Sequence, residues 1–364
     1  MSLQISPPDI ATRPTITPCR PGRNVVVVGA GILGASVAWH LAKQGISVTV
    51  LEKELEPARG VTRWSYGWVG TGSVLPSDDM DNFASKLVAI HEFGSLEREL
   101  GPLPIAARGA IVWLDSDEET IRLIEDQQAA GAQMTPLQRT QIRDLEPCLA
   151  SPPAVAAWAP HDFAIEPADL TRQLLAAAQD AGAKIVYGES AEGILTNGGR
   201  AIGVRTANIT IRADAIVMAN AASAISLVAD LGITLPVRTE PAVLMRFEAT
   251  STKVNHLLYC EDLELRPDRA GGLVSADDYP LEGDAGLAQL AERTVQTIAR
   301  ILTPAVKPPL RTVTAAHRPM IENGKPLRSF LPGIEGLYAV IAHPGIILAP
   351  HLGRLAATEI IDVT

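Results

Sequence analysis

Cysteine is scarce in this sequence, with Cys19, Cys148 and Cys260 as the only three in 364 residues. Three cysteines so far apart match neither a disulfide framework nor the paired spacing of a zinc site. Free thiols in such low number are typical of a reducing compartment, so we expect a cytoplasmic protein.

Positive charge and long apolar runs are also lacking. The chain has 31 Lys and Arg against 41 Asp and Glu, a formal net charge of -10. That balance leaves no basic stripe, so nucleic acid and anionic membrane surfaces are poor partners. Gly, Pro or charged residues interrupt every apolar stretch well short of a membrane span. We expect no integral membrane segment, and the composition leaves a homo-oligomer open.

The motifs of metal and serine chemistry are missing as well. The seven histidines include no H-E-x-x-H pair, and no G-x-S-x-G occurs, so we expect no metal site. Residues 1–24 are rich in Pro, Thr and Arg and contain no apolar run of signal-peptide length. We predict that residues 1–19 form a disordered lead-in.

The segment 25–53, VVVVGAGILGASVAWHLAKQGISVTVLEK, has the pattern of a dinucleotide-binding βαβ unit. Four consecutive valines predict a buried parallel strand. Gly29, Gly31 and Gly34 then follow in G-x-G-x-x-G spacing, and an apolar helical pattern leads to a second strand that ends at Glu52. The sequence therefore predicts strand, glycine turn, helix, strand and acidic residue in that order.

Each part of this unit has a physical role. Gly29 permits the tight turn, Gly31 lets the backbone approach a pyrophosphate, and Gly34 lets the helix pack closely on the strand. The helix N-terminus offers free N–H groups and the positive end of its dipole to phosphates. Glu52 can accept a hydrogen bond from a ribose 2′-OH and would repel a 2′-phosphate, which argues against NADP. The unit alone does not separate FAD from NAD.

Several later segments carry a family resemblance. They are ARGVTRWSYGWVG (58–70), HDFAIEPADLTRQLLAAAQDAGAKIVYG (161–188), ADAIVMANAAS (213–223), AAHRPMIENGKP (315–326) and LYAVIAHPGIILAPHLG (337–353). Together with the glycine motif, these resemble the FAD-dependent amine and amino-acid oxidoreductases, the family of glycine oxidase, sarcosine oxidase and D-amino-acid oxidase. The resemblance extends from Asn24 to the C-terminus, and it favours FAD over NAD.

The resemblance implies an α/β fold of two interleaved domains. One is a Rossmann-like FAD-binding domain, and the other is an α+β substrate domain built on a mostly antiparallel sheet. We place the FAD-binding domain at 20–85, 155–236 and 311–364, and the substrate domain at 86–154 and 237–310. The strand-and-turn pattern of 237–280 agrees with this division.

The resemblance also implies a site for FAD, bound without a covalent link. Family members that attach flavin covalently use a cysteine in the C-terminal return or a histidine in the early loop, and neither is found here, with His317 the one residue that keeps a covalent link open. The implied cofactor-binding residues are Gly29, Ala30, Gly31, Ile32, Leu33, Gly34, Glu52, Lys53, Arg63, Ser65, Gly67, Trp68, Ala191, Ala219, Asn220, Arg318, His343, Pro344, Gly345, Ile346, Ile347 and Leu348.

The segment AHPGIILAPHLG (342–353) is too apolar for an ordinary exposed loop. In the family it passes beside the flavin, and the helix that begins near Ile347 directs its N-terminus at the flavin edge where reduction places negative charge. The positive end of the helix dipole would stabilise that charge. The alternative is a plain helix start packed in the core.

Four residues are candidates for contact with the substrate or the reacting centre. By the resemblance, Arg318 binds the substrate carboxylate, with a structural ion pair as the alternative. Trp68 lies beside the flavin or is a core tryptophan. His343 tunes the flavin or only supports it by hydrogen bonding. Glu264 stands where glycine oxidase-like relatives carry an aromatic residue that grips the carboxylate.

Two departures from the family pattern affect the expected chemistry. A glutamate at 264 would repel a carboxylate and suits a second, cationic group, unless it is simply a solvated residue on a strand face. The stretch 273–278 has no lysine, whereas relatives that react fast with oxygen often carry one there. The electron acceptor is therefore open.

The sequence thus favours an FAD-dependent oxidoreductase that oxidises the C–N bond of an amino acid or secondary amine. Hydride transfer to flavin N5 would give an imine that hydrolyses to a carbonyl compound. One alternative is a dehydrogenase that passes electrons to a quinone or partner flavoprotein. The other is a flavin-binding subunit of a larger complex without turnover of its own.

Overall fold

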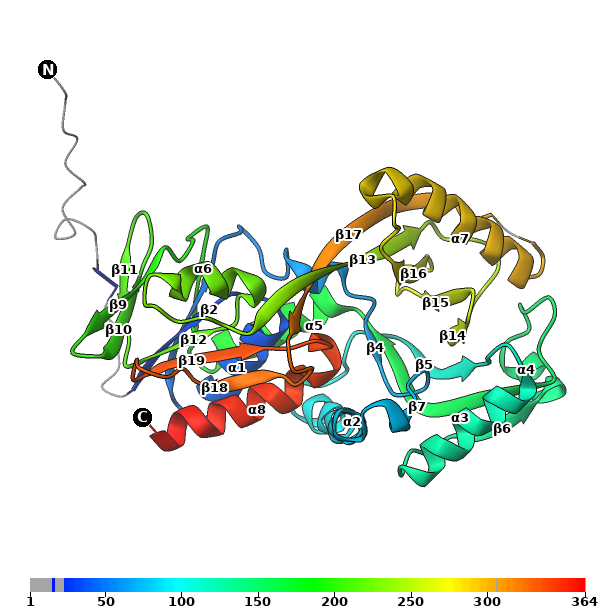
Figure 1. Ribbon diagram of the computed structural model, residues 1–364, viewed down its shortest axis with the longest axis horizontal. Coiled ribbons are helices and arrows are strands. Elements are labelled where there is room, and N and C mark those ends of the chain that lie inside the picture. Colours follow the sequence, from blue (N-terminus) through cyan, green and yellow to red (C-terminus); the bar gives the residue numbers. More distant parts are fainter. Residues whose placement is uncertain (1–14, 17–22, 306, 364) are drawn as a thin grey trace, which may run out of the picture.

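The structure is a computed structural model that describes residues 15–16, 23–305 and 307–363. Its strands form three sheets of six, nine and four strands. In Figure 1 the six- and four-stranded sheets make up one end of the molecule, the nine-stranded sheet makes up the other, and the long strands β13 (Val237–Phe247) and β17 (Leu310–Ile321) run between the two ends. The α/β fold class is confirmed.

The six-stranded sheet is the predicted dinucleotide-binding sheet. Its order is β18 (Leu327–Phe330), β19 (Leu337–Ile341), β12 (Ala215–Met218), β2 (Asn24–Val28), β3 (Ser47–Glu52) and β8 (Lys184–Tyr187). The valine-rich strand β2 pairs in parallel with both β12 and β3. Three helices, α1 (Ile32–Ala42), α5 (Pro167–Asp180) and α8 (Gly345–Val363), share the core on one of its faces.

A small sheet covers the other face. It contains β1 (Thr15–Ile16), β11 (Thr210–Arg212), β10 (Arg200–Arg205) and β9 (Gly193–Asn197), and with α6 (Ala224–Ala229) it encloses a second core. Strand β1 pairs in parallel with β11, so the predicted disordered lead-in is wrong at residues 15–16. The rest of that lead-in lies outside the described residues.

The nine-stranded sheet is antiparallel except for one parallel pair, β14 with β5. Besides β13 and β17 it contains β16 (Leu273–Asp278), β15 (Leu263–Pro267), β14 (Leu257–Cys260), β5 (Ile105–Val112), β7 (Val155–Ile165), β4 (Trp68–Val69) and β6 (Thr135–Gln138). Strands β4 and β7, and all of β17 except Leu310, fall within segments assigned above to the FAD-binding domain. Strand β17 is fixed to this sheet because it pairs with β13 along its length, although Ile321 at its end belongs to the second core.

The remaining helices flank the two ends of the molecule. Helices α3 (Asp117–Ala129), α4 (Arg139–Leu145) and α7 (Leu287–Ile301) pack against the large sheet. Helix α2 (Met80–Leu100) packs on α8, where Arg354 donates a 2.9 Å hydrogen bond to Glu92, and it also places Phe93 edge-on against Phe163 of β7. Within the described ranges, no helix has both the length and the apolarity that a membrane crossing requires.

Helix α1 buries a histidine that should make stability sensitive to acid. His40 is 6% exposed, and both of its ring nitrogens lack a hydrogen-bond partner among the described residues. Burial, helped by Lys43, lowers its pKa from 6.5 to about 4. The folded state therefore binds the proton less well than the unfolded state, so this stability is present above pH 6.5 and is lost as the pH falls toward 4.

Replacing His40 by leucine removes that titration. Lowering the pH from 7 to 5 should reduce the free energy of unfolding of the wild type. We expect this reduction to be about 2 kcal/mol smaller in His40→Leu, because one pKa unit corresponds to 1.36 kcal/mol. Chemical denaturation at both pH values measures the free energy of unfolding. His91→Leu, at an exposed site on α2, is the control and should follow the wild type. If the free energy of unfolding falls equally in His40→Leu and in the wild type between pH 7 and pH 5, the burial argument is contradicted.

Candidate active site

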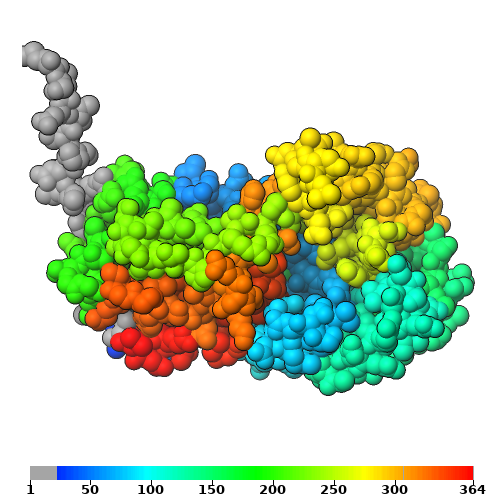
Figure 2. Space-filling view, in the orientation of Figure 1, coloured from blue at the N-terminus to red at the C-terminus, as the bar shows by residue number. Residues whose placement is uncertain are grey.

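A cavity of about 1250 Å³ joins the two halves of the molecule. It begins at the carboxyl ends of β2, β3 and β12 and continues to strands β13, β15, β16 and β17 of the large sheet. Ligands of open parallel sheets bind at these strand ends. Figure 2 shows the surface hollowed between α2 and the yellow strands of the large sheet. The volume exceeds the roughly 300–1,000 Å³ of ordinary ligand pockets, which leaves room for a large cofactor together with a substrate.

The glycine turn at one end is fixed by close backbone packing. Gly29 has φ 105°, and a Cβ there would lie 2.9 Å from the carbonyl oxygen of Ala219. A Cβ on Gly31 would lie 3.2 Å from Thr62 Oγ1, and one on Gly34 would lie 2.0 Å from the carbonyl oxygen of Gly29. Gly29 and Gly31 line the cavity, whereas Gly34 supports the turn from behind.

Glu52 braces this turn and also lines the cavity. Its Oε2 accepts a 2.7 Å hydrogen bond from the Ala30 N–H, and its Oε1 accepts one of 3.0 Å from the Glu54 N–H. The side chain is 8% exposed. A carboxylate has about four acceptor positions, so two backbone donors leave capacity for ribose hydroxyls.

The N-terminus of α1 opens into the same space. Its first residue, Ile32, donates its N–H to Thr62 Oγ1 over 3.2 Å, and Gly31 has no capping side chain. Thr62 lines the cavity but was not among the predicted contacts. Its contact joins positions 30 residues apart, and no local pattern marks such a pair.

A buried polar atom on the cavity wall that has no partner is a further indication of a ligand site. Asn220 Oδ1 is buried and has no hydrogen-bond partner within the described chain, and buried polar groups normally have one. With the glycine turn, the α1 N-terminus and Glu52, the wall offers hydrogen-bonding groups suited to phosphates and a ribose. The residues present therefore fit FAD.

The apolar segment 342–353 faces this cavity on one side. His343, Pro344, Gly345, Ile346 and Ile347 line the cavity. The two isoleucines are also 7% and 2% exposed members of the core that α1 shares. Helix α8 begins at Gly345, two residues before the expected start. The segment therefore packs in the core and also presents the start of a helix to the cavity. Each of the two interpretations drawn from the sequence describes part of it.

The charged groups near α8 make this part of the cavity positive. Burial, then Arg318 and Lys86, lower the pKa of His343 to about 4, so its imidazole is neutral at pH 7. Lys86 of α2 lines the cavity and was missed by the sequence analysis, because a lysine on an amphipathic helix is normally solvated.

Arg318 lies on β17 with no ion-pair partner among the described residues. Its cross-strand neighbour Glu240 forms an ion pair with Arg238 instead. Arg318 lines the cavity, and its Nε is buried without a hydrogen-bond partner. The predicted alternative, a structural ion pair, is therefore not what this structure contains. A guanidinium in this state is ready to bind an anion from the cavity.

Trp68 is held in the cavity wall by a buried carboxylate. Its Nε1 donates a 2.8 Å hydrogen bond to Asp162 Oδ2, which also accepts from the Gly72 N–H at 2.8 Å. Burial raises the pKa of Asp162 to about 6, against the lowering effect of these donors. Trp68 is thus fixed in orientation and reaches the cavity from β4.

Glu264 points into the cavity from β15 rather than into bulk solvent. Burial raises the pKa of its carboxyl to about 8, with Arg266 lowering it and Asp277 raising it. No hydrogen bond from the described residues satisfies its side chain. The alternative of a solvated residue on a strand face therefore does not describe this site.

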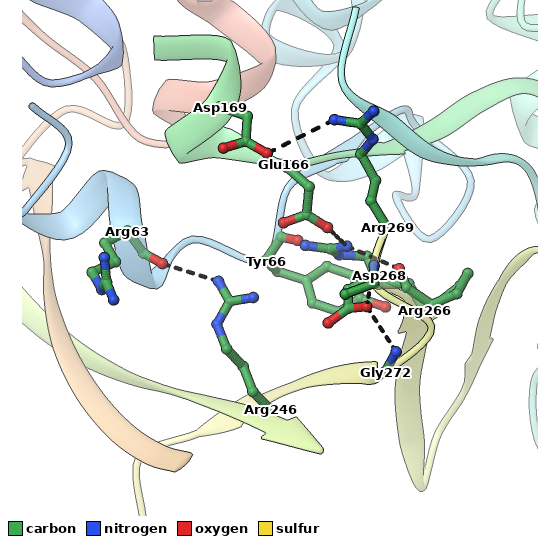
Figure 3. Close-up of polar contacts among 11 residues, drawn as sticks. Arg63, Tyr66, Glu166, Asp169, Arg246, Arg266, Asp268, Arg269 and Gly272 are labelled. Carbon is green, nitrogen blue, oxygen red and sulfur yellow. Dashed lines mark hydrogen bonds and ion pairs between the residues drawn. The ribbon is translucent and has the colours of Figure 1, made fainter. Parts of the chain in front are cut away.

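The remaining predicted residues divide between cavity and surroundings. Ile32, Leu33, Lys53, Ser65, Gly67, Ala191 and Ala219 line the cavity, whereas Ala30, Arg63 and Leu348 do not. The backbone carbonyl of Arg63 accepts a 3.2 Å hydrogen bond from Arg246, as Figure 3 shows. Arg63 thereby fixes the loop that carries the neighbouring cavity residues. No group of three or more metal-ligating side chains occurs in the described ranges.

Comparison with known proteins identifies relatives along nearly the whole chain. The family model described as FAD dependent oxidoreductase matches residues 24–359. Glycine oxidase of Pseudomonas aeruginosa is 26% identical, covering 92% of this chain and 93% of the relative. D-amino acid dehydrogenase of Allorhizobium ampelinum is 25% identical, covering 88% and 90%. The crystal structure of glycine oxidase from Geobacillus kaustophilus superposes with a TM-score of 0.78 at 21% identity, covering 94% and 96%.

Proposed function

The chain belongs to the FAD dependent oxidoreductase family, and from this membership and the cavity we propose that it oxidises the C–N bond of an amino acid or secondary amine. The observation that carries the proposal is Arg318, whose guanidinium has no partner among the described residues and lies in the same cavity as the glycine turn. A dinucleotide site and an anion-binding arginine in one space suit a redox reaction on a substrate with a carboxylate.

The residues of this chain bind and orient the reactants. FAD, when bound, supplies the hydride acceptor for the substrate Cα–H. Arg318 holds the substrate carboxylate, and Trp68, fixed by Asp162, limits where the substrate can lie. Such positioning supplies much of the rate enhancement when little acid–base chemistry is needed. The imine product then hydrolyses in water.

The α8 N-terminus supports the same reaction electrostatically. A helix N-terminus carries roughly half a positive charge and unpaired N–H donors. His343 is neutral at pH 7, so it adds no charge of its own, and Arg318 and Lys86 provide the cations nearby. Together these groups favour a negative charge that develops in the cavity.

Anaerobic mixing with an amine panel tests the proposed function. The panel contains D- and L-amino acids, N-methyl amino acids and cyclic imino acids. Loss of the yellow flavin colour with at least one of these is the expected result. If none bleaches the flavin, the chain is a flavin-binding subunit and not an enzyme of this class.

The electron acceptor remains a choice between oxygen and another acceptor. Strand β16 has no lysine, which favours a dehydrogenase that uses a quinone or partner flavoprotein. Lys86, however, supplies a cation to the same cavity from α2. Oxygen-electrode traces with a substrate that bleaches the flavin distinguish the two, because only an oxidase consumes oxygen at the rate of turnover.

We expect the FAD to be bound without a covalent link. Neither Cys148 nor Cys260 lines the cavity, and Cys19 lies outside the described residues. His317 does line it. Acid precipitation should leave the yellow colour in the supernatant. Colour that stays in the pellet for the wild type but not for His317→Ala would instead identify a covalent bond at His317.

A further inference from the structure

We propose that the cavity has a second, acidic end at Glu264 that binds a cationic group of the substrate. The preferred substrate is then an amino acid with a positively charged nitrogen on its side chain. The inference rests on the proposed function, and it goes further by naming the class of side chain that the site selects.

Strand register places Glu264 and Arg318 on one face of the large sheet. Glu264 pairs with Ala276, which pairs with Leu244 on β13. Leu244 in turn pairs with Thr314, on the strand that carries Arg318 four residues later. Directly opposed residues share a face, as do residues two and four apart on one strand. The two charged side chains therefore line one cavity from different strands.

The wall between these two residues contains Leu244 and three alanines. Ala242, Ala276 and Ala316 all line the cavity on the same face. Alanines leave space where larger residues would fill the gap between the charged ends. The wall therefore accommodates a substrate that extends from Arg318 toward Glu264, longer than glycine or sarcosine.

The two ends differ in charge. At the end near α8, Arg318 and Lys86 are the charges that act on His343. At the other end, Arg266 and Asp277 are the charges that act on Glu264. The Arg266 guanidinium is already paired, since its Nη1 lies 2.9 Å from Glu166 Oε1 and its Nε donates to the Tyr66 carbonyl at 2.6 Å, as Figure 3 shows. Glu264 itself has no ion pair or hydrogen bond among the described residues, and the Nη2 of Arg266 is also left without a hydrogen-bond partner there.

Aromatic rings surround the acidic end. Tyr66 and Trp68 line the cavity with ring centroids 6.5 Å apart, and Tyr259 lies 6.1 Å behind Trp68. The carboxyl of Glu264 acts on both tyrosines and raises their pKa values further, after burial. A carboxylate among aromatic faces is a typical receptor for ammonium and guanidinium groups.

The raised pKa of Glu264 also results from its surroundings in the cavity. Burial dominates and raises the pKa to about 8, although Arg266 lowers it. A bound cation would favour the charged carboxylate and lower that pKa, so ligand binding should release a proton near neutral pH. Cation binding thus gives a partner to a carboxyl that has none in the described chain.

Matched substrate pairs test this with the holoenzyme. Norleucine lacks only the side-chain ammonium of lysine, and citrulline is the neutral counterpart of arginine. For the enantiomer that bleaches the flavin, we expect kcat/KM to be about 30-fold higher or more for the cationic member of each pair, and Glu264→Gln to reduce this ratio to near one. Asp277→Asn removes a neighbouring carboxylate outside the cavity and should keep most of the preference.

Binding of unreactive carboxylates gives a second readout that needs no turnover. Titration of the flavin absorbance with 6-aminohexanoate and with hexanoate should give the lower Kd for the amino compound in the wild type and equal Kd values in Glu264→Gln. Equal Kd values in the wild type, or a preference unaffected by Glu264→Gln, would overturn the inference. Bleaching by neutral amino acids would leave the proposed function intact in that case, whereas no bleaching by any amine would refute the function separately.

Discussion

Arg318→Ala should lower kcat/KM by a factor of about 30 to 1,000 while the protein keeps its FAD. The factor corresponds to roughly 2–4 kcal/mol, the range for removing one partner of a buried hydrogen-bonded charge pair. Arg318 has no ion pair to lose among the described residues. The substitution therefore removes substrate binding rather than a structural contact, and folding stability should change little.

Two comparisons make the Arg318 result specific. Arg318→Lys keeps the charge but loses the planar fork that binds a carboxylate with two hydrogen bonds, so it should recover only part of the lost kcat/KM. An amine substrate without a carboxylate should be oxidised equally by wild type and Arg318→Ala. If Arg318→Ala retains the wild-type KM for carboxylate substrates, Arg318 does not bind the carboxylate.

Gly34→Ala should prevent formation of the yellow holoprotein. The added Cβ would lie 2.0 Å from the carbonyl oxygen of Gly29, and this backbone atom cannot move without opening the glycine turn. The turn itself is held by the Glu52 contact to Ala30 and by the packing of Gly29 on Ala219. We expect at least a tenfold loss of FAD per chain, or insoluble protein. The ratio of absorbance at 450 and 280 nm measures FAD content.

Two further glycines serve as controls for this substitution. Gly94 lies in α2 with open space where a Cβ would be, so Gly94→Ala should stabilise the helix by about 0.5–1 kcal/mol and keep the FAD. Gly353 of α8 would place a Cβ 2.1 Å from Ser36 Oγ of α1, away from the cavity. Gly353→Ala should therefore lower the stability of the fold before it affects FAD content. Normal FAD content in Gly34→Ala would show that the turn tolerates a side chain.

The parts predicted well from sequence are those whose signal is local. The valines of β2, the three glycines and Glu52 form one continuous pattern, and the structure brings Gly29, Gly31 and Glu52 to one cavity. Each step of that pattern depends on neighbours along the chain, such as strand burial or the turn that glycine permits. The position of Arg318 came from the family resemblance.

The parts that sequence could not give depend on contacts between distant segments. Thr62 meets Ile32 across 30 positions, and Lys86 reaches the cavity only because α2 packs beside α8. Glu264 could have been solvated, since an alternating strand pattern does not say which face borders a cavity. Strand pairing also decided the sheet to which β7 and β17 belong. No single segment contains that information.

The most direct test of the central claim is the product balance of one anaerobic turnover. The enzyme with bound FAD is mixed with an acyclic amine or amino acid that bleaches it, and the released ammonia or amine, the carbonyl product and the reduced FAD are quantified together. Oxidation of the C–N bond predicts one nitrogen product and one carbonyl product for each FAD reduced. Reduced FAD without release of a nitrogen product would show that a different bond is oxidised and would contradict the account.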